Sequence, residues 1–588
     1  MEILPVYDVV IIGAGLAGLS LARQLLLTSD KTVLLVDKRS DVPPPRQKVG
    51  EATVQVSGYY LSKVLDLEEH LLREHFMKYN LRFYWKTAGR RNSCYEDYSQ
   101  CYIRAFSNIA SYQLDRNKLE VELLRRNRQT PNFDFAAPVA DLNVSLSQEG
   151  LHEVTLRNNG AVVSAKAEWV VDTSGRGKFL VRRVGLGRPN SIRHGASFVW
   201  VDGLVNVEKL TDLSPREIRL RRDRALTGHL PVWLATNHFM GEGFWFWIIP
   251  LQGKTSLGLV YDNRKFCGDL VCTPQKLIKW VCHEFPLFAH DLPSREILNH
   301  GSFRDFSYDC GQAISRSKWA LSGEAGRFSD PLYSPGGDLI ALHNTFITDA
   351  ILTPHPDDLA SKILLYDQLM RSLYEAYVPS YAVSYDVLGD QEAFALKYTW
   401  ELSVYFAFYV FPFINDLFTD PKFVRLFLCK FSRLGQVKRN LQSFISAYYQ
   451  WKKSEAEPCQ EPLFHDFTDI GSLRGAESAF YHVGVSVGEA AQILERQYDS
   501  LRELARYIGA YVSSVVLSDR DILTNRSFVE SVDLEELRFD PDEMRERCDK
   551  CTKSCGAYRW SFNPFVLERF RSQVSASLQP MASAEVGK

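Results

Sequence analysis

Residues 8–37 read DVVIIGAGLAGLSLARQLLLTSDKTVLLVD. The apolar run 9–12 leads into a glycine-rich turn, a helical pattern follows as far as Leu26, and a second apolar run, 33–36, ends on Asp37. Short apolar runs on either side of a helical pattern are typical of buried parallel strands joined by a crossover helix. The stretch therefore predicts a strand, helix, strand unit of the Rossmann type.

The turn of this unit matches the dinucleotide-binding fingerprint G-x-G-x-x-G. Gly13 permits the tight turn, Gly15 lets the backbone approach a pyrophosphate, and Gly18 lets the helix pack closely on the strand. The pyrophosphate is expected at the helix N-terminus, where free N–H groups and the macrodipole favour an anion. Gly13, Ala14, Gly15 and Gly18 are therefore predicted to contact a cofactor.

The acid that ends the second apolar run supports this interpretation. Asp37 stands nineteen residues beyond Gly18 and is followed by Lys38, a place from which it can accept hydrogen bonds from an adenosine ribose. A glycine-rich turn alone also arises for structural reasons. The combination of strand, helix and terminal acid favours dinucleotide binding, with Asp37 and Lys38 at the adenosine end.

Length and composition limit the possible classes of protein. A chain of 588 residues exceeds what one hydrophobic core usually serves. With 45% hydrophobic and 24% charged residues it resembles an ordinary soluble protein, and a formal net charge of -2 provides no field for nucleic acid. The first strand starts within ten residues of Met1, so we expect no signal peptide, a cytoplasmic location and eleven reduced cysteines without disulfides.

Two segments invite other interpretations. Residues 402–415 (LSVYFAFYVFPFIN) are uncharged and aromatic, but they are too short for a transmembrane span and Pro412 interrupts them. A buried helix is expected, with contact to a membrane surface or an apolar substrate as the alternative. Cys548, Cys551 and Cys555 suggest zinc, yet no second cysteine pair accompanies them, so surface thiols and no metal are expected.

The remaining pattern predicts an α/β protein. A Rossmann-type nucleotide-binding domain formed by 1–190 and 311–355 encloses a β-sheet insertion at 191–310 that faces the substrate, and a helical C-terminal region covers 356–588. The expected local elements are helices at 57–75 and 111–126, a strand at 168–172 that closes the nucleotide sheet, paired strands at 244–251 and 256–261, a linker at 452–461 and a frayed tail after Leu578.

Four motifs occur in the order of one known family. They are the fingerprint at 13–18, the loop Val49-Gly50-Glu51-Ala52-Thr53, the strand Trp245-Phe246-Trp247-Ile248-Ile249-Pro250 and the loop 323–337. Together they resemble the flavin-dependent halogenases of the tryptophan-halogenase superfamily, and the WxWxIP pattern is the most distinctive. The resemblance covers roughly residues 5–350. The fingerprint and the DTSG strand end also occur across flavoprotein monooxygenases.

The resemblance implies the chemistry. FAD, reduced by a separate NAD(P)H-dependent flavin reductase, reacts with O2 to give a C4a-hydroperoxide, which chloride or bromide attacks. The hypohalous acid then travels through a tunnel to a lysine beside the aromatic substrate.

In the family this lysine stands in a K-x-x-x-x-F pattern, which Lys78 and Phe83 match. An amine in an apolar pocket has a lowered pKa and can hydrogen-bond or trap an electrophilic halogen. The alternative is a surface lysine.

The resemblance also implies roles for other residues. Side chains alternate along a strand, so Trp245 and Trp247 share one face. They form either an aromatic wall beside the substrate, together with Tyr333, or ordinary core. The resemblance places Glu51 near the flavin, where the alternative is a solvated carboxylate on a loop. The predicted cofactor contacts also include Ala52, Glu324 and Gly337, with Glu324 and Asp37 as ribityl and ribose contacts.

One loop departs from the family pattern. Residues 331–337 read PLYSPGG, where the tryptophan halogenases have a glutamate and then Ser-Thr-Gly, whose last two N–H groups hold the halide. Tyr333 in place of the glutamate argues against free tryptophan as substrate. Pro335 lacks an N–H, so the expected halide site at Pro335 and Gly336 loses a donor at a cost of about 1.5–3 kcal/mol. Gly337 offers a replacement.

These observations predict an FAD-dependent halogenase-like enzyme of specialised metabolism. Its substrate is expected to be an electron-rich aromatic of phenol or pyrrole type, free or held by a carrier protein. The first alternative is a flavoprotein monooxygenase, which Pro335 favours. The second is a flavin-binding protein without turnover, in which Lys78 and the WxWxIP strand are only core.

Overall fold

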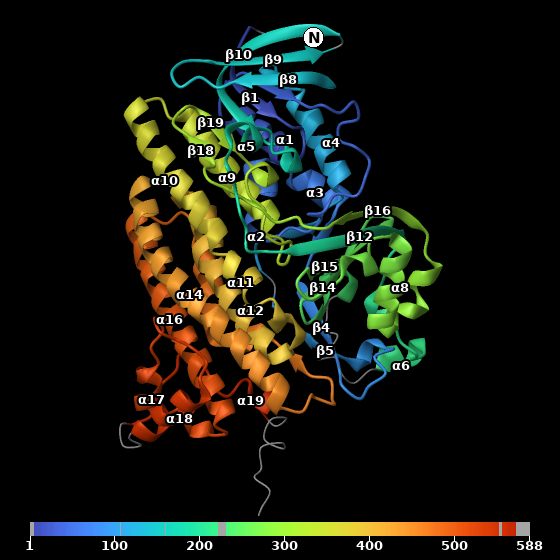
Figure 1. The fold of residues 1–588 in the computed structure, drawn as a ribbon, viewed down its shortest axis with the longest axis vertical. Helices are drawn as coiled ribbons and strands as arrows, with labels where there is room; N and C mark the ends of the chain where they lie inside the picture. The colour runs from blue at the N-terminus through green and yellow to red at the C-terminus, as the bar shows by residue number, and fades with distance from the viewer. Residues whose placement is uncertain (1–4, 106, 159, 221–230, 552–555, 572–588) are drawn as a thin grey trace, which may run out of the picture.

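The computed structural model describes residues 5–105, 107–158, 160–220, 231–551 and 556–571. Two mixed eight-stranded sheets and a layer of long helices form most of the described structure (Figure 1), and two small sheets pair β3 (Phe76–Lys78) with β6 (Ser111–Gln113) and β11 (Gly187–Arg188) with β17 (Asp309–Cys310). The nucleotide-type sheet lies at one end and the second sheet beside it, while the helices from yellow to red in the figure run alongside both.

The first sheet contains the predicted Rossmann unit. Its central strand β1 (Val6–Ile12) pairs in parallel with β2 (Val33–Val36) and with β10 (Ala161–Asp172), and α1 (Leu16–Thr28) is the crossover helix. The expected strand at 168–172 is the end of β10, so it does return to the nucleotide sheet. The other members are β7 (Phe133–Ala136), β8 (Val139–Ser145), β9 (His152–Asn158), β18 (Ile314–Ser315) and β19 (Trp319–Leu321).

The second sheet has eight strands in the order β16-β12-β15-β14-β13-β4-β5-β20. The predicted strand pair is present as β14 (Phe244–Leu251) and β15 (Lys254–Asp262), which are antiparallel. The sheet also takes in strands from outside 191–310, because β4 (Leu81–Lys86) pairs in parallel with β13 (Thr236–Gly241). The remaining members are β5 (Tyr98–Cys101), β12 (His194–Asp202), β16 (Ile297–Phe303) and β20 (Phe464–His465).

Helices cover both sheets. The expected buried helix at 402–415 is confirmed, since α12 (Gln391–Tyr405), a π-helical turn (Phe406–Val410) and α13 (Phe411–Ile414) are almost entirely buried. Within the described ranges no helix is long and apolar enough to cross a membrane. The other helices that begin after residue 330 are α9 (Pro335–Leu352), α10 (Pro356–Glu375), α11 (Val378–Ala382), α14 (Pro421–Glu455), α15 (Gly471–Phe480), α16 (Val487–Val516), α17 (Arg526–Ser531), α18 (Pro541–Lys550) and α19 (Glu568–Arg571).

The single helix predicted at 57–75 is wrong. The segment forms α2 (Gln55–Tyr59), a π-helical turn (Tyr60–Val64) and α3 (Glu68–Glu74). Asp66 has a φ of 56° and interrupts the helix between Leu65 and Leu67, both of which are fully buried. The break allows two closely spaced leucines to enter the core, which a continuous helix would place on different faces.

The helix predicted at 111–126 begins later than expected. Residues Ser111–Gln113 form strand β6, which pairs with β3 (Phe76–Lys78). The helix α4 (Arg116–Asn127) is capped by Asp115, whose carboxylate accepts a hydrogen bond from the Asn117 N–H at 3.0 Å. A carboxylate is a strong N-cap, so the helix starts there and not at Ser111.

The linker predicted at 452–461 starts too early. Helix α14 continues to Glu455 because Lys452 bonds Asp390 at 2.9 Å and Glu392 at 2.6 Å.

The ten cysteines of the described ranges are free thiols, and these ranges hold no metal-binding group of His, Cys, Asp or Glu. Cys555 and the tail after Leu578 lie outside the described residues.

Three further α-helices lie between α4 and α9 in the described ranges. They are α5 (Phe179–Val184), α6 (Pro215–Leu220) and α8 (Pro274–Glu284). Of these, α8 packs against β12 and covers the face of the second sheet that carries Phe246 and Ile248. The opposite face of that sheet is left for the cavities described below.

Candidate active site

The fingerprint opens onto a cleft at the carboxyl ends of the first sheet. We call this the nucleotide cleft; its walls include Gly13, Gly15, Asp37, Lys38 and Thr173. Carboxyl ends of parallel strands are where ligands bind in open α/β sheets. Ala14 and Gly18 do not line the cleft but shape the turn beneath it.

Each fingerprint glycine has a structural reason to be glycine. Gly13 has a φ of 109°, and a Cβ there would lie 2.7 Å from the Thr173 carbonyl oxygen. A Cβ on Gly18 would lie 2.1 Å from the Gly13 oxygen, which confirms the close packing of helix on strand. A Cβ on Gly15 would meet no atom within 4 Å, so that space belongs to the cleft.

Asp37 is held inside the protein. Its Oδ2 accepts hydrogen bonds from the Ala14 N–H at 2.8 Å and from Arg39 at 2.7 Å, and its Oδ1 accepts from the Arg39 backbone and Nε, both at 2.9 Å. Burial opposes its ionisation, but these bonds outweigh burial and hold the pKa of Asp37 below its usual value. All four acceptor positions are used. A ribose hydroxyl would therefore have to displace one bond to Arg39, a residue that the sequence did not single out.

A second space continues from the nucleotide cleft, and we call it the middle cavity. Both are lined by Val49, Arg116 and Glu324, so they are contiguous. The pKa of Glu324 is raised by burial, which Arg176 and Arg116 oppose. The middle cavity also contains the following predicted residues: Glu51, Ala52, Trp245, Trp247, Gly336 and Gly337.

Glu51 is a buried carboxyl and not a solvated loop residue. Its side chain is 1% exposed, and it accepts hydrogen bonds from Trp200 Nε1 at 2.6 Å and Ser256 Oγ at 2.5 Å. Burial raises the pKa of Glu51 to about 7 against the effect of these two donors. A group poised between its two protonation states at neutral pH thus lies in the wall of the middle cavity.

The two tryptophans of β14 share one face, as predicted. They line the middle cavity, with ring centroids 5.6 Å apart, while Phe246 and Ile248 pack in the core on the opposite face. Trp247 Nε1 donates to Ser256 Oγ at 3.1 Å. The structure separates this pair from Tyr333, which lines a different cavity. The three residues predicted as one wall therefore belong to two neighbouring spaces.

The N-terminus of α9 points its first turn into the middle cavity. Tyr333 and Ser334 precede the helix with φ values of 68° and 60°, a left-handed conformation that is costly for residues other than glycine. Pro335 is the first helical residue, where a missing N–H is tolerated. Among the described residues none accepts a hydrogen bond from the N–H of Gly336 or Gly337.

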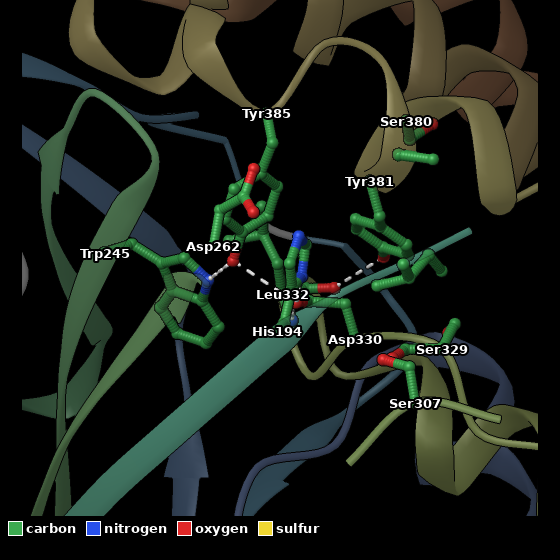
Figure 2. Close-up of polar contacts among 12 residues, drawn as sticks. His194, Trp245, Asp262, Ser307, Ser329, Asp330, Leu332, Ser380, Tyr381 and Tyr385 are labelled. Carbon is green, nitrogen blue, oxygen red and sulfur yellow. Dashed lines mark hydrogen bonds and ion pairs between the residues drawn. The ribbon is translucent and has the colours of Figure 1, made fainter. Parts of the chain in front are cut away.

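A buried network anchors the loop that enters α9 (Figure 2). Asp330 Oδ2 contacts His194 Nδ1 at 2.6 Å and accepts from the Tyr385 hydroxyl at 3.2 Å, while Oδ1 accepts from the Leu332 N–H at 2.8 Å. The Tyr385 hydroxyl in turn accepts from Trp245 Nε1 at 2.7 Å. Sequence reasoning missed this network, because its members come from four distant segments that share no motif.

Lys78 opens into a third space, which we call the tyrosine cavity. Its walls include Tyr333, Tyr377, Tyr398, Tyr405 and Tyr409. Lys78 itself is 6% exposed, and Nζ has no hydrogen-bond partner among the described residues. Burial lowers the pKa of Lys78 to about 7, and the charge of Asp338 in the first turn of α9 opposes this. A surface lysine is excluded.

The tyrosine cavity and the middle cavity are neighbours. Tyr333 lines the first and Ser334 the second, and the same holds for Val54 and Ala52. The left-handed pair Tyr333 and Ser334 therefore forms part of the partition between them. The nucleotide cleft and the middle cavity share lining residues, and the tyrosine cavity with Lys78 lies on the other side of this partition.

Comparison with known proteins also points to a Rossmann-like domain and to the flavin-dependent halogenases. A family model described as an NAD(P)-binding Rossmann-like domain matches residues 11–43. Flavin-dependent halogenase chlA of Dictyostelium discoideum is 25% identical over 442 residues, which are 71% of this chain and 72% of that protein. Tetracycline 7-halogenase of Kitasatospora aureofaciens is 25% identical over 360 residues, 56% of this chain and 60% of that protein.

Solved halogenases share the fold. The structure of halogenase PltM in complex with phloroglucinol and FAD has a TM-score of 0.58 at 17% identity and covers 85% of this chain and 96% of its own. The chondrochloren halogenase CndH has a TM-score of 0.51 at 18% identity, covering 66% of this chain and 84% of its own. The resemblance predicted from the four motifs is confirmed: this chain is related to the flavin-dependent halogenases over most of its length.

Proposed function

We propose that the protein is an FAD-dependent halogenase that acts on an electron-rich aromatic of phenol or pyrrole type. One observation carries the proposal: an unpaired, buried Lys78 amine opens into a cavity lined by tyrosines, next to the cavity that receives the N-terminus of α9. A lysine with a purely structural role would be expected to pair its buried amine with an acceptor, because an unpaired buried amine is costly.

The nucleotide cleft and the middle cavity fit FAD. The open space at Gly15 and the start of α1 suit a pyrophosphate, with Asp37 and Lys38 at the adenosine end. Glu51, Ala52, Glu324 and Gly337 would hold the remainder of the cofactor in the middle cavity. When bound and reduced, FAD supplies with O2 the oxidising power that converts chloride or bromide into hypohalous acid.

The start of α9 is the proposed halide site. Gly336 and Gly337 direct unpaired N–H groups from the positive end of an eighteen-residue helix into the middle cavity. Pro335 contributes no donor, so Gly337 replaces the N–H that the family takes from the preceding position. An anion held by two backbone N–H groups needs no charged side chain.

Lys78 is the proposed catalytic residue. With a pKa of about 7, its amine is available both as a hydrogen-bond donor and as a nucleophile for an electrophilic halogen. Lys78 would present the hypohalous acid to the aromatic ring. A carbon–halogen bond then forms, the halogen–oxygen bond breaks, and the ring proton leaves with the hydroxyl group as water.

The substrate class follows from the tyrosine cavity and the relatives. The six tyrosines in its wall favour a flat aromatic. Halogenase PltM was solved with phloroglucinol, and a relative from Pseudomonas fluorescens is named as a chlorinase of a pyrrole on a peptidyl-carrier protein. A phenol or a pyrrole, free or tethered to a carrier protein, is therefore proposed, as are a cytoplasmic location and a separate flavin reductase.

A second function rests on Pro335. The loss of one halide donor favours a flavoprotein monooxygenase that delivers oxygen instead of halogen. The deciding experiment supplies the FAD-loaded protein with a flavin reductase, NADH, O2 and a panel of phenols and pyrroles, with and without chloride or bromide. Halogenation predicts products whose mass depends on the halide. An oxygenated product that forms without halide replaces the proposal, and no product at all indicates a flavin-binding protein without turnover.

A further inference from the structure

The tyrosine cavity contains a second buried lysine besides Lys78. Lys438 lies on α14, is 7% exposed and lines the cavity together with Glu401 of α12. In the described part of the chain, no carboxylate or hydrogen-bond acceptor lies within bonding distance of its Nζ. A lysine buried without a partner is rare, because loss of hydration is costly for an ammonium group.

Glu401, the carboxylate that acts on Lys438, forms its ion pair with a different lysine. Glu401 Oε1 bonds Lys397 Nζ at 2.6 Å, and Lys397 has further bonds to Ser384 Oγ at 2.9 Å and to the Ser380 oxygen at 3.0 Å. Glu401 Oε2 has no hydrogen-bond partner among the described residues, so the charge of Glu401 is shared between Lys397, which it bonds directly, and Lys438, which it does not bond.

The charges around Lys438 act in opposite directions. Burial lowers the pKa of Lys438 to about 8, Glu401 raises it, and Lys397 lowers it again. The group therefore remains mostly an ammonium at pH 7. Glu477, the other carboxylate in the cavity wall, bonds the Tyr481 hydroxyl at 2.9 Å and is not among the charges that act on Lys438. Lys438 thus lines the cavity without an ion pair of its own, while Glu401 is bonded to Lys397.

We propose that Lys438 determines substrate specificity by pairing with an anionic group, a carboxylate or an ionised phenol, on the aromatic substrate. The proposal rests on the halogenase function and adds the substrate class to it. Lys438 binds the acidic substituent, the tyrosine rings hold the ring, and Lys78 acts on the carbon that receives the halogen. Substrate binding then supplies the directly bonded partner that Lys438 lacks, which explains why an unpaired ammonium is retained.

The test compares two probes of the same shape that differ in charge. They are 2,4-dihydroxybenzoate and the neutral 2,4-dihydroxybenzamide, titrated calorimetrically into the FAD-loaded protein at pH 7. Wild type is expected to bind the benzoate at least about tenfold more tightly, as a charge-assisted hydrogen bond implies. Lys438→Met should abolish this preference and leave benzamide binding within about threefold of wild type, and Lys438→Arg should retain the preference.

A matched control lies on the same helix. Lys422 is exposed at the start of α14, so Lys422→Met should leave both affinities unchanged. Equal affinity of wild type for the two probes, binding of neither probe, or a preference that survives Lys438→Met would each overturn the proposal. If Lys438→Met does not fold, Lys438→Gln takes its place, because Lys78 lines the same cavity and a wild-type preference alone does not identify the lysine. Failure of the halogenase function would appear separately, as a benzoate preference without any halogenated product.

Discussion

Lys78 and Glu51 are buried residues whose pKa values are moved toward neutrality from opposite sides. Burial disfavours the charged form of each, which lowers the pKa of the amine and raises that of the carboxyl, both to about 7. They lie in the walls of neighbouring cavities. Such displaced pairs are typical of sites that handle protons or electrophiles at neutral pH.

Replacing Lys78 by alanine should abolish halogenated product while flavin reoxidation and peroxide release continue, because the lysine acts after the flavin chemistry. Lys78→Arg should also fail, since arginine keeps the charge but cannot lose its proton. Product mass and hydrogen peroxide are measured together. Lys86→Ala is the control, because Lys86 is exposed on β4 and bonds Glu284. Halogenation that survives Lys78→Ala would show that another residue presents the halogen.

Replacing Glu51 by glutamine should change how stability depends on pH. The pKa of Glu51 is raised on folding from 4.5 to about 7, so its stabilising proton is fully bound below pH 4.5 and is lost as the pH rises through 7. The free energy of unfolding of wild type should therefore fall relative to Glu51→Gln by up to about 3 kcal/mol between pH 4.5 and pH 8. Urea unfolding at a series of pH values measures this. Parallel curves for the two proteins would contradict a neutral Glu51.

At the scale of elements, α9 and the loop before it form the junction of the site. The loop adopts two consecutive left-handed residues, Tyr333 and Ser334, and strain of this kind persists only where surrounding contacts hold it. Asp330 provides those contacts through His194, Tyr385 and the Leu332 N–H. His194 of the second sheet and Tyr385, which follows α11, thus hold the loop that leads into α9.

Replacing Pro335 by threonine should strengthen halide binding. Threonine adds an N–H at the first position of α9 and also relieves Ser334, since a residue before proline is disfavoured in helical conformations. The halide concentration for half-maximal rate should fall severalfold. Steady-state rates against chloride and bromide measure it, and Pro356→Thr, at the exposed first position of α10, serves as the control. An unchanged halide dependence would place the halide elsewhere.

Replacing Asp330 by alanine should destabilise the protein by roughly 3 kcal/mol, because buried donors on Leu332, Tyr385 and His194 lose their acceptor. Asp330→Asn keeps one acceptor and should cost less. Chemical unfolding measures stability. The ratio of halogenated product to released peroxide reports whether the loop still positions the start of α9. If Asp330→Asn lowers stability but leaves that ratio unchanged, the network is structural and does not position α9.

At the scale of the molecule, the site is assembled from all three layers. The first sheet contributes the nucleotide cleft, the second sheet contributes the tryptophan face, and the helices contribute the tyrosine cavity. The spaces adjoin where these layers meet, so no layer contains a complete site. Figure 1 shows that α11 and α12 lie beside the second sheet at this junction.

The whole chain should depend on a separate flavin reductase. It contains one dinucleotide fingerprint, at residues 13–18, and no second one that would hold NAD(P)H. Stopped-flow mixing of NADH or NADPH with the FAD-loaded protein should leave the flavin absorbance unchanged for many seconds, whereas addition of a reductase should bleach it. Rapid bleaching by nicotinamide cofactor alone would refute the dependence.

The local parts of this protein follow from the sequence. Three features depend on residues close together in the chain: the fingerprint, the shared face of Trp245 and Trp247, and the position of Lys78 in a recognised motif. Turn chemistry and side-chain alternation determine the local structure there. Even there, the breaks near Asp66 and Asp115 were missed, because burial of leucines and a cap overrode a helical pattern.

Which distant groups meet depends on how the separate segments pack. Glu51 finds its donors on Trp200 and Ser256, and Asp330 finds His194, 136 residues away. In the sequence, Lys438 is an ordinary polar residue in the pattern of a long amphipathic helix. Because α14 packs against α12, its side chain lines the tyrosine cavity. Local pattern cannot reveal such pairings, since burial, charge balance and the resulting pKa values arise only when separate segments exclude water together.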